Sequence, residues 1–147
     1  MVKNRQIHRT YLAAVSGDLS GQPEGTIDVS IARLPGSTIE RIPDPVHGES
    51  AVTHYQLLSY QPETGTSLLM IRLETGRTHQ IRVHMKYIGH PLYGDFLYNP
   101  DYRFLQRQSL HSWQLSFTHP VSKIPMEFTA PIPDDMQQFL PDIWIQK

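Results

Sequence analysis

The sequence predicts an α+β fold in which a mostly antiparallel sheet packs against one or two helices. Six segments are rich in β-branched and aromatic residues, or alternate between apolar and polar residues, as strands do. Only two segments, 78–88 and 136–140, place apolar residues at helical spacing. Because 12 prolines and 9 glycines interrupt the chain, we expect short elements joined by turns.

Length and composition limit the kinds of protein that this chain can form. With 147 residues, 39% of them hydrophobic and 18% charged, we expect one folded domain with a core. No apolar run approaches the ~20 residues of a membrane span, and the N-terminus has no long apolar run of the secretory type, so we expect no membrane association. The lack of cysteine excludes disulfides and thiolate metal sites and fits a cytoplasmic protein.

Four strands are predicted before the first helix, at residues 9–15, 26–33, 51–59 and 67–73. The second has the clearest pattern, because Ile27, Val29 and Ile31 alternate with small or polar residues. The last two flank the turn QPETGT, and we expect them to pair antiparallel. The proline-rich stretch 34–48 predicts a loop or a short hairpin.

The strand pattern then changes to helical spacing. Apolar residues recur at Ile81, Met85 and Ile88, with Thr78 as the expected N-cap and Gly89 as the expected end. After a loop with several turn signals, the sequence predicts two more strands and a second short helix, at residues 109–118, 124–130 and 136–140.

The first predicted helix has a polar stripe beside its apolar one. His79, Arg82 and Lys86 fall together on this stripe, which therefore presents nitrogen donors. Residues 71–90 contain four basic residues and one acidic residue, in a chain with a net charge of −1. The segment GRT, residues 76–78, precedes the helix, where free backbone N–H groups would stabilise a phosphate or carboxylate. The same pattern also fits a solvated helix face with a weak surface ion pair.

Other catalytic chemistries do not fit the motifs. His79 and His84 point about 140° apart on a helix and no carboxylate completes a set with His90, so we expect no metal site. The sequence contains no GxSxG, P-loop or GxGxxG motif. Tyr11 has two interpretations, because a tyrosine in the strand RTYLAAV suits either a core position or a stacking surface for a nucleobase.

The segment from Leu73 to Asp95, LETGRTHQIRVHMKYIGHPLYGD, resembles the signature of the ribosomal large-subunit pseudouridine synthase family, the Rlu group. RTYLAAV around Tyr11 is similar to the tyrosine segment of that family, and AVTHYQLL and LHSWQLSFTHPVSKIPMEFTAPIPDDM are similar to its later parts. The resemblance covers essentially the whole chain and implies part of a pseudouridine synthase catalytic domain.

The resemblance implies an enzyme that isomerises uridine to pseudouridine in RNA without a cofactor or metal. In this family the target nucleotide is flipped out of the RNA, and an aspartate attacks it or assists cleavage of its glycosidic bond. By motif position the catalytic residues are Arg82, the partner of that aspartate, and Tyr11, which lies against the base and is a candidate proton acceptor. Positions assigned to RNA or substrate binding are Arg77, Thr78, His79, Ile81 and Lys86.

The aspartate itself has no counterpart in this sequence. In the family it lies in a stretch of the type HRLDxxTSG upstream of the tyrosine segment, and these 147 residues contain no such stretch. Asp95 matches a position outside that motif, and we interpret it as a turn-stabilising residue. We therefore expect residues 1–147 to be the C-terminal portion of a catalytic domain, lacking the aspartate segment and the N-terminal RNA-binding module, and inactive alone.

Three points stay open at the level of sequence. The chain could instead be a non-catalytic RNA-binding module derived from this fold, or an unrelated α+β interaction domain. The expected partner is large-subunit ribosomal RNA, but related enzymes act on transfer RNA and no signature identifies the uridine. Faces that the missing half would cover are expected to promote self-association.

Overall fold

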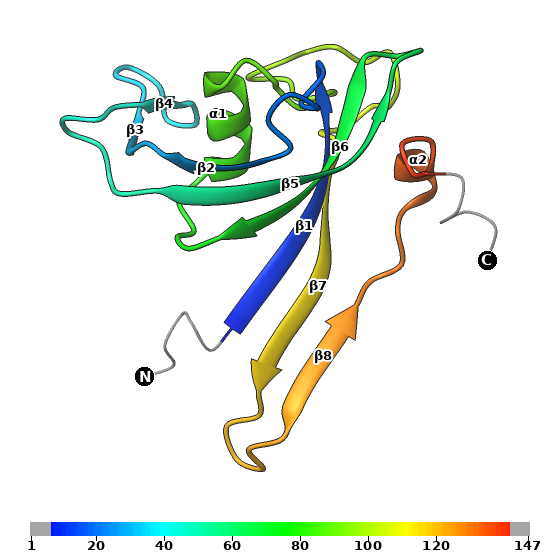
Figure 1. Cartoon of the computed structure of the whole chain (residues 1–147). Helices are drawn as coiled ribbons and strands as arrows, with labels where there is room; N and C mark the ends of the chain where they lie inside the picture. The colour runs from blue at the N-terminus through cyan, green and yellow to red at the C-terminus, as the bar shows by residue number, and fades with distance from the viewer. Residues whose placement is uncertain (1–6, 142–147) are drawn as a thin grey trace.

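The computed structural model describes residues 7–141. Six strands form one antiparallel sheet in the order β2-β5-β6-β1-β7-β8, and β3 and β4 pair in a separate hairpin (Figure 1). The elements are β1 (Ile7–Ser16), β2 (Glu24–Asp28), β3 (Ile31–Arg33), β4 (Arg41–Pro43), β5 (Val52–Gln61), β6 (Thr66–Leu73), α1 (Gln80–Tyr87), β7 (Leu110–Thr118), β8 (Pro125–Thr129) and α2 (Asp134–Gln137). The predicted α+β fold, a mostly antiparallel sheet with two short helices, is therefore confirmed. Within residues 7–141, no helix has the length and apolar character needed to cross a bilayer.

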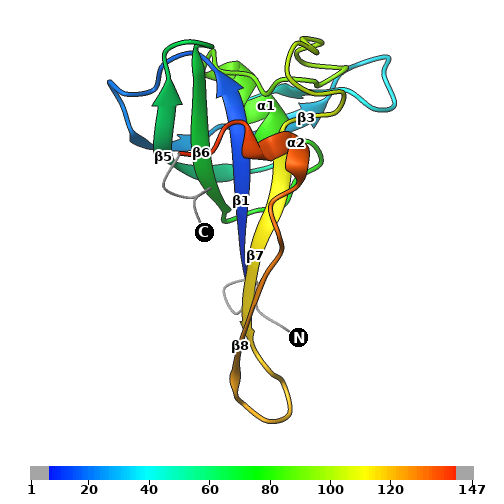
Figure 2. The ribbon, with the colours of Figure 1, turned by 90° about the vertical axis from the view of Figure 1, so that its right-hand side faces the viewer.

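Strand β1 lies inside the sheet, and its alternating residues divide the core between the two faces. Ala13 and Val15 belong to the cluster beneath α1, together with Ile81 and Met85. Ala14 belongs to the cluster on the opposite face, which α2 and the residues after it cover (Figure 2). All three β1 residues are fully buried, as expected for an inner strand covered on both faces.

Helix α1 begins later than the sequence predicts. The expected N-cap was Thr78, but the structure has His79 there, with a φ of 59° and no side-chain hydrogen bond to the helix. The buried side chain of Gln80 accounts for the shift. Its Oε1 accepts the backbone N–H of Arg77 at 3.0 Å and the hydroxyl of Thr75 at 2.7 Å, which fixes the turn before the helix.

The other predictions for α1 are confirmed. Gly89 follows the helix with a φ of 89°, a conformation that favours glycine, and its N–H donates to the carbonyl of Lys86 at 2.9 Å. Ile81 and Met85 are buried, and Ile88 packs against the same core. The apolar stripe therefore faces the sheet, and the polar stripe faces away from it.

The predicted strand 26–33 is wrong as a single element. β2 ends before Val29, and Ile31 begins β3, which pairs with β4 outside the main sheet. The carbonyl of Val29 accepts a hydrogen bond from His84 Nε2 on α1 at 2.8 Å, so the chain leaves the sheet toward the helix here. Ile31 then packs in a separate small core beside α1.

The C-terminal elements follow the prediction with one shift. The predicted strands at 109–118 and 124–130 correspond to β7 and β8. The second helix begins at Asp134 instead of Met136 and ends before Phe139 and Leu140, which are buried just beyond it. The apolar spacing at the C-terminus therefore predicts correctly which residues are buried, but it does not predict where the helix begins and ends.

Candidate active site

Arg82 and Asp95 form the central ion pair of the site. Arg82 Nε donates to Asp95 Oδ2 and Arg82 Nη2 donates to Asp95 Oδ1, each at 2.8 Å. The side chains are 11% and 1% exposed, so water screens the pair weakly. The hydrogen bonds that Arg82 donates to Asp95 raise the pKa of Arg82, which keeps the guanidinium charged. The sequence identifies Arg82 as an anion-binding residue but gives no signal that Asp95 is its partner within this chain.

Asp95 also organises the loop that follows it. Its Oδ1 accepts the backbone N–H groups of Leu97 at 3.1 Å and Tyr98 at 3.2 Å. The backbones of Asp95 and Asn99 exchange two hydrogen bonds. The predicted turn-stabilising role of Asp95 is thus confirmed, and one carboxylate fixes both the loop and Arg82.

Two aromatic rings from this loop flank the guanidinium. Arg82 Cζ lies 5.1 Å from the ring centroid of Tyr98 and 6.0 Å from that of Phe96. Lys86 Nζ lies 5.9 Å from the Tyr98 ring. Tyr98 is buried, whereas Phe96 is 65% exposed. The polar stripe of α1 is therefore covered by aromatic rings at Arg82 and open to solvent at Lys86.

His79 connects this site to the β3–β4 hairpin. Its Nδ1 lies 2.9 Å from the hydroxyl of Tyr98, which accepts the backbone N–H of Arg41 at 2.8 Å. Burial lowers the pKa of His79, and the charges of Arg82 and Arg41 lower it further against the opposing charge of Asp95. His79 is therefore largely neutral at pH 7, which favours a hydrogen-bonding role over a phosphate-binding charge.

Tyr11 and Ile81 belong to one apolar region on the α1 face of the sheet. Tyr11 is partly buried and packs against the core cluster that contains Ile81, which is 5% exposed. The pairing of β1 with β7 shifts register between Thr10 and Tyr11, and such irregularities change the direction of a side chain. The structure thus brings the tyrosine segment to the cluster that includes the residue before Arg82.

The residues just before α1 are partly anchored. Arg77 Nε donates to the carbonyl of Ser50 at 2.7 Å, and its Nη1 lies 3.6 Å from Glu49 Oε2. Thr78, beside it, is exposed. Arg77 is therefore held in place at the start of the helix by the segment before β5.

The three histidines considered as metal ligands have separate partners. His84 is fully buried, with Nε2 donating to the Val29 carbonyl and Nδ1 lying 2.7 Å from the hydroxyl of Thr53. His90 Nδ1 lies 2.8 Å from the carbonyl oxygen of Ser16. Because His79 contacts Tyr98, the three rings do not converge on a common point.

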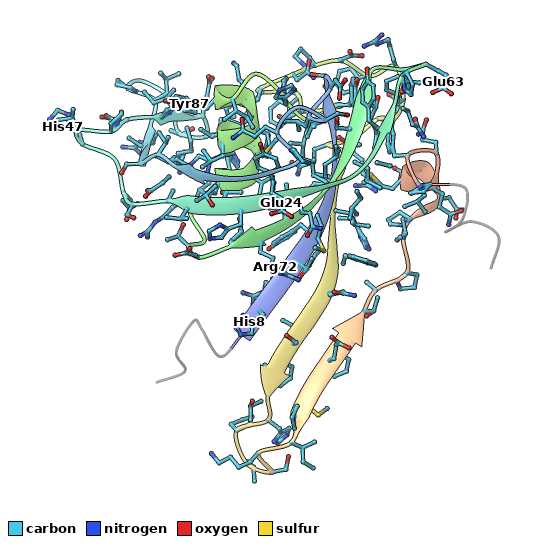
Figure 3. The ribbon with its side chains drawn as sticks, in the orientation of Figure 1. His8, Glu24, His47, Glu63, Arg72 and Tyr87 are labelled. Atoms are coloured by element: carbon cyan, nitrogen blue, oxygen red, sulfur yellow. The ribbon has the colours of Figure 1, made fainter. Side chains whose placement is uncertain are left out.

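The opposite face of the sheet contains an open hollow of about 410 Å³. Its lining comes from β2, β5 and β6 and includes Glu24, His54 and Arg72. Figure 3 labels two of these residues, together with His8 at the start of β1. None of the residues assigned to catalysis or RNA binding lines this hollow, so the candidate site is the one around Arg82.

Comparisons with known proteins agree on one family. The family described as RNA pseudouridylate synthase matches residues 1–87, a range that contains Tyr11 and Arg82. The chain is 46% identical over 138 residues to an uncharacterized RNA pseudouridine synthase, YjbO, of Bacillus subtilis. It is 39% identical over 154 residues to ribosomal large subunit pseudouridine synthase D of Escherichia coli K12. These alignments cover 94% and 95% of this chain but 47% and 45% of the relatives, so it spans about half the length of the curated relatives it matches.

Solved structures have the same fold. Human RNA pseudouridylate synthase domain containing 1 matches with a TM-score of 0.76 and 26% identity, covering 92% of this chain and 58% of that chain. Human RNA pseudouridylate synthase domain containing 4 has a TM-score of 0.69 at 21% identity, a likeness of fold alone. Taken with the family match over residues 1–87, these similarities show that the chain belongs to the RNA pseudouridylate synthase family, within its Rlu group.

Proposed function

We propose that this chain forms part of the active site of an enzyme that isomerises uridine to pseudouridine in RNA. Arg82 would hold the catalytic aspartate, which comes from a segment outside these 147 residues. Tyr11 would lie against the target base, and Ile81 would contribute to the apolar wall. Neither a metal nor a cofactor has a role in this proposal.

The observation that carries the proposal is that Asp95 accepts hydrogen bonds from only part of the Arg82 guanidinium. Asp95 accepts one N–H from Nε and one from Nη2, and the group has five N–H donors. Within residues 7–141, the three other N–H groups have no hydrogen-bond acceptor. Two of them, on Nη1 and Nη2, form a second parallel pair, which is the geometry that a carboxylate accepts best.

The residues around this pair suit RNA. Lys86 is an exposed cation, and Arg77 and Thr78 lie at the start of α1, where phosphate is favoured. His79 would shape the site through Tyr98. Large-subunit ribosomal RNA is the substrate that we favour, because one relative is named a ribosomal large subunit pseudouridine synthase, and such a substrate implies a cytoplasmic enzyme.

Activity assays on two proteins test this function. The isolated chain, incubated with a uridine-containing ribosomal RNA fragment, is expected to form no pseudouridine when nucleosides are measured by mass spectrometry. A chimera that carries, before Met1, the part of the Bacillus subtilis relative preceding the aligned region is expected to form it. In that chimera Arg82→Lys is expected to lower the rate on the order of 10²-fold, because lysine cannot hold two carboxylates in place.

Each assay has an outcome that contradicts the proposal. Pseudouridine made by the isolated chain would show that no second segment is needed. A folded chimera that binds RNA but makes no pseudouridine would favour a non-catalytic RNA-binding module.

A further inference from the structure

The aromatic ring of Phe96 has one face covered and one face open. Arg82 Cζ lies over the ring, 6.0 Å from its centroid. The side chain is nevertheless 65% exposed. With the guanidinium over the ring and most of the residue exposed, the opposite face of the ring is the surface available to a ligand. The attraction between a cation and the ring face holds the ring against Arg82.

The backbone that carries Phe96 is fixed on both sides. The preceding residue, Asp95, accepts two hydrogen bonds from Arg82 and two from the backbone N–H groups of Leu97 and Tyr98. Its backbone also exchanges hydrogen bonds with Asn99. An aromatic ring on such a loop is ordered before any ligand arrives, so less conformational freedom is lost on binding.

A free positive charge lies in the same neighbourhood. Lys86 is exposed, and its Nζ is 5.9 Å from the Tyr98 ring, which is itself 5.1 Å from Arg82 Cζ. Within residues 7–141, Lys86 forms no ion pair. An exposed aromatic ring and an exposed cation in one region of the surface, here linked through Arg82 and Tyr98, are the combination that binds single-stranded nucleic acid, through base stacking and phosphate contact.

We propose that the open face of Phe96 stacks on a base of single-stranded RNA adjacent to the target uridine, with Lys86 contacting a neighbouring phosphate. This inference rests on the proposed function and adds a second nucleotide position to it. Stacking accepts any base, because every base has a π-face, so the site anchors the RNA strand without reading its sequence. The ordinary alternative is that Phe96 only shields Arg82 from water, a role that an aliphatic side chain would also fill.

Binding of fluorescein-labelled oligouridylate to the 147-residue chain, measured by fluorescence anisotropy, separates the two roles. Phe96→Leu keeps the apolar bulk but removes the π-face, and is expected to weaken binding about tenfold. Phe96→Tyr and Phe96→Trp are expected to bind like the wild type. Lys86→Gln is expected to weaken binding and to reduce its dependence on salt by about one ion. The matched control is Phe128→Leu on β8, the edge strand beyond β7, where an aromatic side chain is 52% exposed and no change is expected.

An abasic oligonucleotide of the same length provides a readout that a purely structural role would not move. Phe96→Leu is expected to bind it as the wild type does, because no base is present to stack.

Three outcomes would overturn the stacking site. Phe96→Leu could weaken binding of both oligonucleotides equally, it could bind oligouridylate as well as the wild type does, or Phe128→Leu could show an equal loss. A wild-type chain that binds no RNA overturns this site, whereas the proposed function is decided separately by the activity of the chimera. A chimera that binds RNA through Phe96 but makes no pseudouridine contradicts the proposed enzymatic function and leaves the stacking site intact.

Discussion

The side chain of Asp95 connects Arg82 to the loop that follows Asp95. It accepts hydrogen bonds from Arg82 and from two backbone N–H groups, and it is 1% exposed. Removing Arg82 would leave a buried carboxylate with only its backbone partners. We therefore expect Arg82→Ala to lower the free energy of unfolding by about 3 kcal/mol, measured by urea denaturation.

A matched pair on the surface provides the control for that prediction. Arg103 and Asp101 also form a bidentate ion pair, with Nε donating to Oδ1 and Nη2 donating to Oδ2, but Arg103 is 65% exposed. Water screens this pair, so Arg103→Ala is expected to change stability far less than Arg82→Ala. Equal effects of the two substitutions would contradict the view that burial of Asp95 makes the Arg82 pair important.

We expect His84 to make the free energy of unfolding depend on pH. It is fully buried, its Nε2–H donates to the Val29 carbonyl, and its Nδ1 accepts from the Thr53 hydroxyl, so the neutral ring satisfies every bond. Burial lowers the pKa of His84, although the bond to Val29 and the charge of Asp28 oppose this. The unfolded chain therefore binds more protons than the folded one once the pH falls below the unfolded value near 6.5.

The expected result is a loss of stability as the pH falls from about 7 to 5, with a contribution of at most about 1.4 kcal/mol per pH unit from His84. Urea denaturation at several pH values measures the slope. His84→Gln is expected to be less stable at pH 7, because the Val29 carbonyl and the Thr53 hydroxyl lose their hydrogen bonds to His84. It is also expected to show a weaker dependence of the free energy of unfolding on pH. An unchanged slope in His84→Gln would assign the pH dependence to other groups.

At the scale of single elements, the β7–β8 turn contains a strained position. Lys123 is exposed and has a φ of 63°, in the left-handed region that glycine adopts without penalty. Lys123→Gly is expected to raise the free energy of unfolding by about 0.5–1 kcal/mol. Lys123→Ala removes the same charge without relieving the backbone, so it is expected to give no gain. A gain in both variants would point to charge instead of conformation.

The element boundaries show what sequence patterns can and cannot predict. Alternation in 26–33 correctly marks Ile27 and Ile31 as buried, but it does not reveal that these residues belong to different sheets. That break depends on the contact of Val29 with His84, which is 55 residues away. The start of α1 was misplaced for a similar reason, because a buried glutamine side chain, and no local cap, fixes the turn before it.

The candidate site shows the same limit at the level of side chains. Helical spacing predicts His79, Arg82 and Lys86 on one stripe. In the structure His79 lies just before the helix, and all three side chains lie around Tyr98. The pairing of Arg82 with Asp95 spans 13 residues and a loop, and no spacing rule links the two positions. The aromatic cover from Phe96 and Tyr98 was missed too, since the loop that carries them has no periodic pattern.

At the scale of the whole molecule, the sheet is covered by a core on its α1 face but is exposed at its β8 edge. The α1 face is closed by a large apolar core and holds the residues assigned to RNA. Strand β8 forms one edge of the sheet, and with β7 it projects away from the body (Figure 1). Its turn and strand expose Val121, Ile124 and Phe128, which are 83%, 57% and 52% exposed. An exposed edge with apolar side chains favours pairing with another chain.

We therefore expect the 147-residue chain to self-associate through this arm, with an apparent mass that rises with concentration in light scattering. The double substitution Val121→Lys and Ile124→Lys is expected to keep it monomeric, because charges on an edge oppose strand pairing. Val46→Lys, at an 80% exposed position in the loop between β4 and β5, is the control and is expected to associate like the wild type. A wild-type chain that stays monomeric at high concentration would show that the arm is tolerated in water, and association in the double variant would place the contact on another surface.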